Sequence, residues 1–272
     1  MHINVCPWTF LTGNYARLRI IAVGFGTASA IVCDTKSEHC IIASTTISES
    51  LHLDSQFPIK MLQRIERSGV IAVLILDDAS HAVPVAKALL AGGVDAMELT
   101  LRTDAAIDSL RQIREHVPEM LAGIGTVINV NQINEIVAAD AHFAVSPGLN
   151  PAVVRKAQDA GLPFAPGVMT PSDIEVAIEL GCRELKFFPA VPSGGLAMLN
   201  SIRAPYAHLG IRFVPLGGVN ADNMTSWLRN PGVFAVGGSW LTPKDAIQSR
   251  NWDEITRRAT EARRIADAKN ES

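Results

Sequence analysis

Short apolar runs rich in β-branched residues alternate with amphipathic segments of helical period from Val70 onward. This alternation constrains the fold more than any other feature, because repeated strand–helix units build a parallel sheet covered by helices. Eight units can be counted, and their expected strands are 70–76, 96–101, 121–126, 142–146, 164–166, 184–189, 212–216 and 233–236. Eight strands and eight helices over roughly 210 residues predict a (β/α)8 barrel.

An open, doubly wound sheet is the alternative α/β fold. Such a sheet normally carries a glycine-rich dinucleotide-binding turn after its first strand. The corresponding segment here is Leu76-Asp77-Asp78-Ala79, which lacks the G-x-G-x-x-G spacing. We therefore predict one α/β domain, a single (β/α)8 TIM barrel that covers residues 59–272.

Two helix signals support this prediction. The segment from Thr170 to Asp173 has a threonine N-cap, a proline at the first helical position and an acid at the third, so it predicts a helix start. Residues 252–268 predict a long closing helix, whose Arg257-Arg258 and Arg263-Arg264 pairs are interpreted as a solvated face.

Residues 1–58 sustain neither helical nor strand period, and we expect a poorly ordered N-terminal extension of unclear structure. Arg17 and Arg19 precede an apolar run over residues 20–32, so a secretory signal peptide is a second interpretation, although two glycines interrupt that run.

The four cysteines lack C-x-x-C spacing. That pattern favours neither disulfides nor zinc, and it predicts a cytoplasmic protein.

Charge and hydropathy argue against two classes of partner. The formal net charge is −3 and the isoelectric point is near 6.2, which indicates no basic surface for nucleic acid. No apolar run reaches the roughly 18 residues that a membrane helix needs. We therefore expect a partner that is a small molecule, with no nucleic acid and no membrane.

One lysine, Lys186, lies within the apolar run from Glu184 to Pro189, which is the sixth expected strand. Burial disfavours the ammonium form of an amine, so a buried Lys186 would be partly neutral and nucleophilic toward carbonyl carbons. The alternative is a lysine that reaches solvent or pairs with a carboxylate such as Glu184.

The reactive groups of a barrel lie at the carboxyl ends of its strands. Strand two presents Glu98 and Arg102 there, and alternation places Thr100 on the same face as Glu98. An ion pair between Glu98 and Arg102 is the structural alternative to catalysis. No histidine falls at an expected strand end, which leaves Glu98 as the candidate acid–base group. No cluster has metal-ligand spacing, so we expect no metal and no cofactor.

Two glycine pairs follow strands seven and eight, at Gly217-Gly218 and Gly237-Gly238, and Ser239 comes next. Barrels frequently bind phosphate with these two loops, through backbone N–H groups that glycine leaves accessible. A lysine, a carboxylate, a guanidinium and this cradle together predict a site for a keto acid that forms an imine and shuttles a proton.

These residues resemble the class I aldolases that act on 2-keto-3-deoxy-6-phosphogluconate (KDPG) and 4-hydroxy-2-oxoglutarate (KHG). The resemblance covers about residues 59–266. Its segments, in family order, are Glu98-Leu-Thr-Leu-Arg102-Thr103, Gly123-Ile-Gly-Thr126-Val127, Ser146-Pro-Gly148, Lys186-Phe-Phe-Pro-Ala190, Gly217-Gly218 and Gly237-Gly-Ser-Trp240.

The resemblance implies that Lys186 forms a Schiff base with C2 of pyruvate and that Glu98 is the acid–base group. It also implies a homotrimer. The substrate-binding residues that it implies are Arg102 and Thr126 for the carboxylate, Pro147 and Phe188 for the pocket wall, and Gly217, Gly218, Gly238 and Ser239 for the phosphate. One residue departs from the family pattern Pro-Thr-Gly-Gly, because Leu216 stands where the threonine is usual and a hydroxyl near the substrate is missing.

The resulting hypothesis is a metal-independent lyase that cleaves KDPG reversibly into pyruvate and glyceraldehyde 3-phosphate, and that also accepts KHG. An aldolase for the epimeric 6-phosphogalactonate substrate is the alternative within the class. Two further alternatives are a phosphate-binding barrel isomerase or epimerase, in which Lys186 is only a charge, and a non-catalytic binding barrel.

Overall fold

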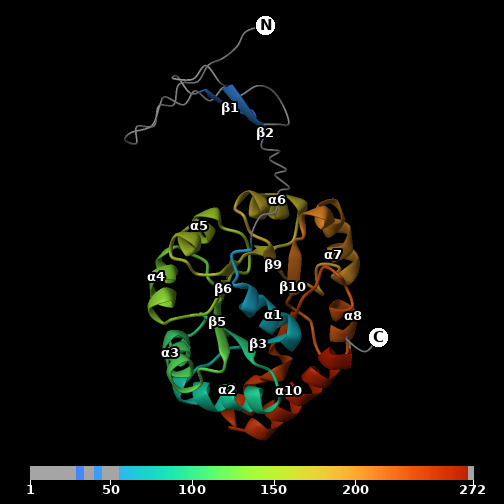
Figure 1. Ribbon diagram of the computed structural model, residues 1–272. Helices are drawn as coiled ribbons and strands as arrows, with labels where there is room; N and C mark the ends of the chain where they lie inside the picture. The colour runs from blue at the N-terminus through green and yellow to red at the C-terminus, as the bar shows by residue number, and fades with distance from the viewer. Residues whose placement is uncertain (1–28, 34–39, 45–54, 269–272) are drawn as a thin grey trace. The chain divides into compact units, whose positions relative to one another are not determined.

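The computed structural model describes residues 29–33, 40–44 and 55–268 (Figure 1). The chain divides into two units, Met1–His52 and Leu53–Ser272. In the first unit, β1 (Ser29–Cys33) and β2 (Cys40–Ser44) pair as antiparallel strands. Most of the expected extension, including the arginines of the signal-peptide interpretation, lies outside the described residues.

The second unit is a closed parallel barrel. Two hydrogen-bonded sheets form it, with strand orders β11-β3-β4-β5-β6-β7 and β10-β9-β8. The strands are β3 (Val70–Leu74), β4 (Ala96–Thr100), β5 (Leu121–Gly125), β6 (Ala144–Val145), β7 (Phe164–Ala165), β8 (Gly167–Val168), β9 (Glu184–Phe187), β10 (Arg212–Pro215) and β11 (Val236–Gly238). Only Pro166 separates β7 from β8, so these two are halves of one strand, and a bridge from Phe213 to Val233 joins β10 to the segment before β11. The (β/α)8 barrel is thereby confirmed.

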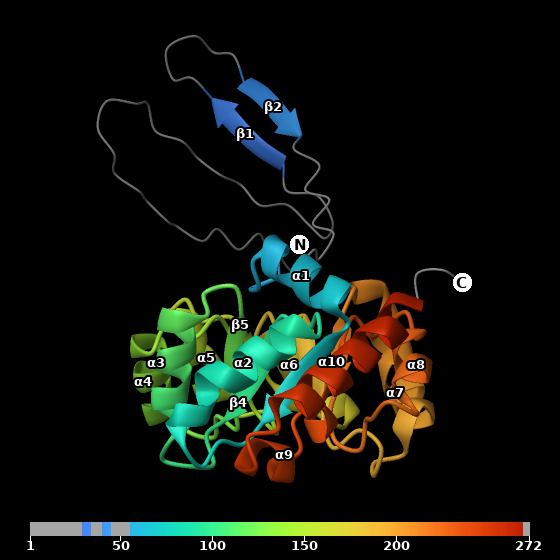
Figure 2. The same ribbon diagram turned by 90° about the horizontal axis from the view of Figure 1, so that it is seen from below.

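Helices surround the strands as an outer ring (Figures 1 and 2). Their long members are α2 (Ala82–Ala91), α3 (Ala106–His116), α4 (Asn131–Ala138), α5 (Pro151–Asp159), α6 (Pro171–Glu179), α7 (Gly195–Arg203) and α10 (Trp252–Asp267). Short ones are η1 (Ala79–His81), η2 (Ala204–Leu209), α8 (Met224–Leu228), η3 (Ser239–Leu241) and α9 (Lys244–Gln248). The helix start at Thr170 is confirmed, because the Thr170 side chain accepts from the Asp173 N–H and the Asp173 carboxylate accepts from the Thr170 N–H.

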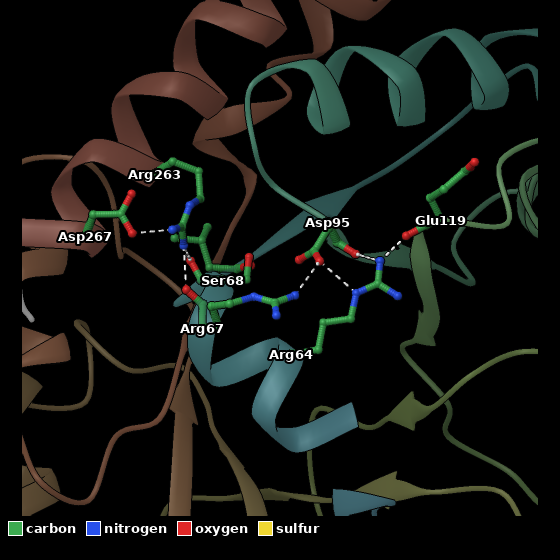
Figure 3. Close-up of polar contacts among 8 residues, drawn as sticks. Arg64, Arg67, Ser68, Asp95, Glu119, Arg263 and Asp267 are labelled. Atoms are coloured by element: carbon green, nitrogen blue, oxygen red, sulfur yellow. Dashed lines mark hydrogen bonds and ion pairs between the residues drawn. The ribbon is translucent and has the colours of Figure 1, made fainter. Parts of the chain in front are cut away.

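Two local predictions were wrong. The last strand is shifted, since Val233 makes only an isolated bridge and β11 begins at Val236. The closing helix does not present all its arginines to solvent. The Arg263 side chain is 18% exposed and donates to the carbonyls of Arg67 and Ser68, both at 2.6 Å (Figure 3).

A helix that periodicity did not predict, α1 (Ile59–Ser68), covers the amino ends of the strands. Its buried residues Leu62 and Ile65, with Phe57 before it, belong to the apolar cluster inside the barrel, together with Phe143 and Phe234. The second apolar cluster of the described residues joins the outward faces of the strands to the surrounding helices. The helix therefore closes the barrel at the end opposite the expected active site.

Polar contacts fix α1 in this position. Arg64 Nε donates to Asp95 Oδ2 at 2.7 Å, and Arg64 also donates to the Glu119 carbonyl (Figure 3). Asp95 precedes β4 and Glu119 lies just before β5. Before the helix, Ser55 Oγ donates to Glu184 Oε2 at 2.7 Å. Contacts with the barrel therefore begin ahead of the domain boundary that we expected between residues 58 and 59.

Candidate active site

The Lys186 amine and the Glu98 carboxylate meet inside the barrel. Lys186 Nζ lies 3.0 Å from Glu98 Oε1 and 3.3 Å from Oε2, and the two side chains are 8% and 3% exposed. Lys186 projects inward from the middle of β9 and Glu98 from the middle of β4. Because both groups are buried, an amine and a carboxylate are held in direct contact with little competing water, an arrangement that can supply a nucleophile and a proton acceptor.

Glycine on β5 makes room for this carboxylate. A Cβ at residue 125 would lie 1.8 Å from Glu98 Oε1, far shorter than any contact between non-bonded heavy atoms. Gly123 and Gly125 are the register partners of Glu98 and Thr100, so β5 has no side chain beside Glu98 at either position. Only glycine permits the observed position of the carboxylate.

The alternative partners of Lys186 and Glu98 are not observed. Glu184 is buried at the opposite end of the barrel, where Arg212 Nη2 lies 3.2 Å from its Oε1. Arg102 follows the end of β4 and is exposed, and within the described residues it has neither an ion pair nor a side-chain hydrogen bond. The guanidinium therefore remains accessible to an anion at the mouth of the barrel.

Three other predicted residues surround the mouth. The Phe188 ring centroid lies 5.6 Å from Lys186 Nζ, which is within the range of a cation–π contact. Thr126 follows β5 directly and has a φ of 64°, which is rare for a β-branched residue and indicates strain held by its surroundings. Pro147 follows β6, and its carbonyl lies so close to Gly167 that a Cβ there would be 2.2 Å away.

The two glycine pairs also lie at this end. Gly217 and Gly218 follow β10 with φ values of 91° and 83°, a left-handed conformation that glycine adopts without strain. Gly238 ends β11 with extended backbone, and Ser239 is exposed with no side-chain hydrogen bond among the described residues. The structure thus brings eight of the ten predicted site residues to the carboxyl ends of the strands, while the other two, Lys186 and Glu98, contact each other inside the barrel.

Comparison with known proteins agrees with this geometry. The family model described as "Aldolase: KDPG and KHG aldolase" matches residues 61–258, which is more than half of the chain. The chain belongs to the KDPG and KHG aldolase family.

Three similar proteins illustrate the match to this aldolase family. The chain is 44% identical over 200 residues to the 2-dehydro-3-deoxy-phosphogluconate aldolase of Dickeya dadantii, covering 74% of this chain and 93% of that one. It is 42% identical over 193 residues to the KHG/KDPG aldolase of Escherichia coli K12, covering 71% and 90%. The chain is also similar to a crystal structure of the Legionella pneumophila KDPG aldolase with pyruvate captured as a covalent carbinolamine. The sequence identity is 37% and the TM-score is 0.71, and the match covers 74% of this chain and 97% of that one.

Membership in the aldolase family makes the protein a carbon–carbon lyase. Groups that could support other chemistry lie away from the mouth. Burial, and then the nearby Arg114, lower the pKa of His142, which sits at the amino end of β6. Burial raises the pKa of the Cys182 thiol to about 12, so it is a poor nucleophile. No three metal-ligating side chains cluster within the described residues. Nor does any helix described here have the length and hydropathy to span a bilayer.

Sequence reasoning missed three features of this aldolase site. It did not assign Gly125 or Gly167 a role, although the first accommodates Glu98 and the second accommodates the Pro147 carbonyl. Their only sequence signal is a glycine inside an expected strand, which often marks close approach of another group. It also missed the Thr100 hydroxyl, which is buried with no hydrogen-bond partner among the described residues.

Proposed function

We propose that this protein is a class I aldolase that cleaves KDPG reversibly into pyruvate and glyceraldehyde 3-phosphate. The observation that carries the proposal is the buried contact of 3.0 Å between Lys186 Nζ and Glu98 Oε1. A lysine that forms an imine needs a nearby group that accepts its proton, and Glu98 is in hydrogen-bonding reach.

The reaction follows from these two side chains. Glu98 accepts a proton from Lys186, the free amine attacks C2 of the keto acid, and Glu98 returns the proton to the carbinolamine hydroxyl, which leaves as water and gives a protonated imine. Glu98 accepts the proton of the C4 hydroxyl, the C3–C4 bond breaks, and the aldehyde leaves while its bonding electrons move into the imine to form an enamine. Glu98 then returns a proton to C3, and water releases pyruvate and the free amine. The imine is the electron sink, so the step requires no metal.

The remaining residues bind the two ends of the substrate. Arg102 and Thr126 hold the carboxylate of the pyruvyl part, and Pro147 and Phe188 form the wall beside the imine. At the other end, backbone N–H groups of Gly217, Gly218 and Gly238 and the Ser239 hydroxyl hold the phosphate. Neutral donors and short helix ends favour a dianion over an uncharged group.

Cleavage of KHG to pyruvate and glyoxylate is a second candidate activity at the same site. The relative from Escherichia coli that bears both substrate names supports it. Leu216 is 6% exposed and borders the site, so the substrate carbons near it meet methyl groups rather than a hydroxyl. A comparison of kcat/KM for KDPG, its C4 epimer and KHG would rank the three substrates.

We further propose that the enzyme works in the cytoplasm as a homotrimer. Ile128, Val130 and Val137 expose 59%, 38% and 41% of their surface at or near α4, and a contact between copies would cover them. Sedimentation analysis would test the trimer, and a monomer at micromolar concentration would exclude it.

Borohydride reduction in the presence of pyruvate tests the catalytic proposal, because it converts an imine into a stable secondary amine. We expect one adduct per chain, on Lys186, identified by peptide mass. Lys186→Arg keeps the positive charge and should abolish the adduct, whereas Lys156→Arg on α5 should leave it in place. Absence of an adduct, or an adduct on another lysine, would favour the isomerase alternative.

A further inference from the structure

A cavity of about 30 Å³ lies inside the barrel, directly beneath the Lys186–Glu98 pair. Both side chains line its upper end, and Phe57 and Ile65 from the α1 region line its lower end. Its side walls include Val145, Ala165 and Val214. The volume exceeds the roughly 10–15 Å³ that one water molecule requires, so a group of methyl size fits.

The chemistry of the walls determines what this cavity accepts. Most of the lining is aliphatic or aromatic, and the charged groups already have partners, Lys186 with Glu98 and Glu184 with Arg212. A buried water needs two to four polar partners, whereas apolar cavities stay dry and accept apolar groups. The space therefore suits a hydrocarbon group better than water.

The position of the base locates the donor carbon relative to the cavity. In the proposed reaction Glu98 exchanges a proton with C3 of the keto acid bound to Lys186, so C3 must lie within reach of the carboxylate. The same carboxylate lines the cavity. A substituent on C3 therefore has an apolar space next to it, and Val214, which is the register partner of Lys186, borders that space.

We propose that the cavity lets the enzyme use 2-oxo acids one carbon longer than pyruvate as donors, with the extra methyl group of 2-oxobutanoate placed beneath the amine. The inference rests on the proposed imine chemistry. The amine adds to C2, water leaves, Glu98 removes a C3 proton, and the resulting enamine attacks the aldehyde to form a C–C bond. Glu98 gives that proton to the aldehyde oxygen, and hydrolysis of the imine frees the product and Lys186. The product is a 4-hydroxy-2-oxo acid that carries a methyl group on C3.

A competition experiment tests this proposal. The full-length protein is incubated with equal concentrations of pyruvate and 2-oxobutanoate, reduced with borohydride, and the two Lys186 adducts, which differ by one methylene group, are counted by mass. The wild type should give both adducts. Val214→Ile, which fills the cavity, should lower the share of the longer adduct roughly tenfold, the effect of one methylene in an apolar pocket. Val214→Ala should raise that share.

Two further variants keep the test decisive. Ala165→Val fills the cavity from another strand and should act like Val214→Ile if the latter does not fold. Val153→Ala truncates a buried valine on α5 in the core outside the barrel, so it should reduce stability and leave the adduct ratio unchanged. The proposal would be overturned if the wild type gave only the pyruvate adduct, or if the Val214 and Ala165 substitutions left the ratio of the two adducts unchanged. Failure of both acids to react would instead refute the imine chemistry.

Discussion

Gly125 on β5 provides the space for the Glu98 carboxylate of β4, because a Cβ at residue 125 would lie 1.8 Å from Glu98 Oε1. Gly125→Ala should therefore displace the carboxylate from Lys186 and reduce kcat by at least tenfold, while pyruvate still reaches the amine. Gly148→Ala is the control, because a Cβ there would meet nothing within 4 Å. Steady-state cleavage assays compare the two. Wild-type kcat in Gly125→Ala would show that the carboxylate has other productive positions.

Glu98→Gln should retain a hydrogen-bond acceptor near Lys186 and lose the base. We expect turnover to fall by roughly 10²- to 10⁴-fold, the usual contribution of a positioned proton-transfer group, and the trapping of pyruvate to slow. A turnover near the wild-type value in Glu98→Gln would assign Glu98 a structural role.

The boundary of the catalytic unit can be tested by truncation. Removal of residues 1–52 should leave activity and melting temperature nearly unchanged, because this segment is a separate unit by its contacts. Phe57→Ala should lower the free energy of unfolding by roughly 3–5 kcal/mol, since Phe57 is 6% exposed and packs inside the barrel. Ile59→Ala, at a residue 66% exposed, serves as the control. Chemical denaturation measures the free energy of unfolding of the Phe57→Ala and Ile59→Ala variants. Lost activity in the truncated protein would mean that the extension supports the barrel.

Ser239→Ala tests the phosphate cradle. Loss of a hydrogen bond to a charged group is worth about 1.5–3 kcal/mol, so kcat/KM for KDPG should fall roughly ten- to hundredfold. The value for KHG, which has no phosphate, should barely change. Parallel kinetics on the two substrates provide the measurement. An equal decrease for both would indicate that the loop after β11 does not contact phosphate.

Most of the fold followed from local pattern. Short apolar runs located seven of the eight strands and placed the eighth about three residues early, because a strand buried on both faces must be continuously apolar. The helix start at Thr170 could also be predicted, because the hydrogen bonds of its capping box are made within four residues. The pattern did not predict α1. That helix does not belong to a strand–helix unit of the barrel, and its apolar face packs against barrel residues such as Phe143 that are distant in sequence.

For the site, the sequence alone determined which residue types end each strand, because a side chain's face on a strand depends only on its position in the alternation. Lys186 and Glu98 could be selected in this way. Only the tertiary structure decided that Lys186 pairs with Glu98 rather than Glu184, that Gly125 provides the space for this pair, and that an apolar cavity lies beneath it. Lys186 and Glu98 lie 88 residues apart in the chain. Distances between such strands are set by barrel closure and side-chain packing, which leave no local pattern.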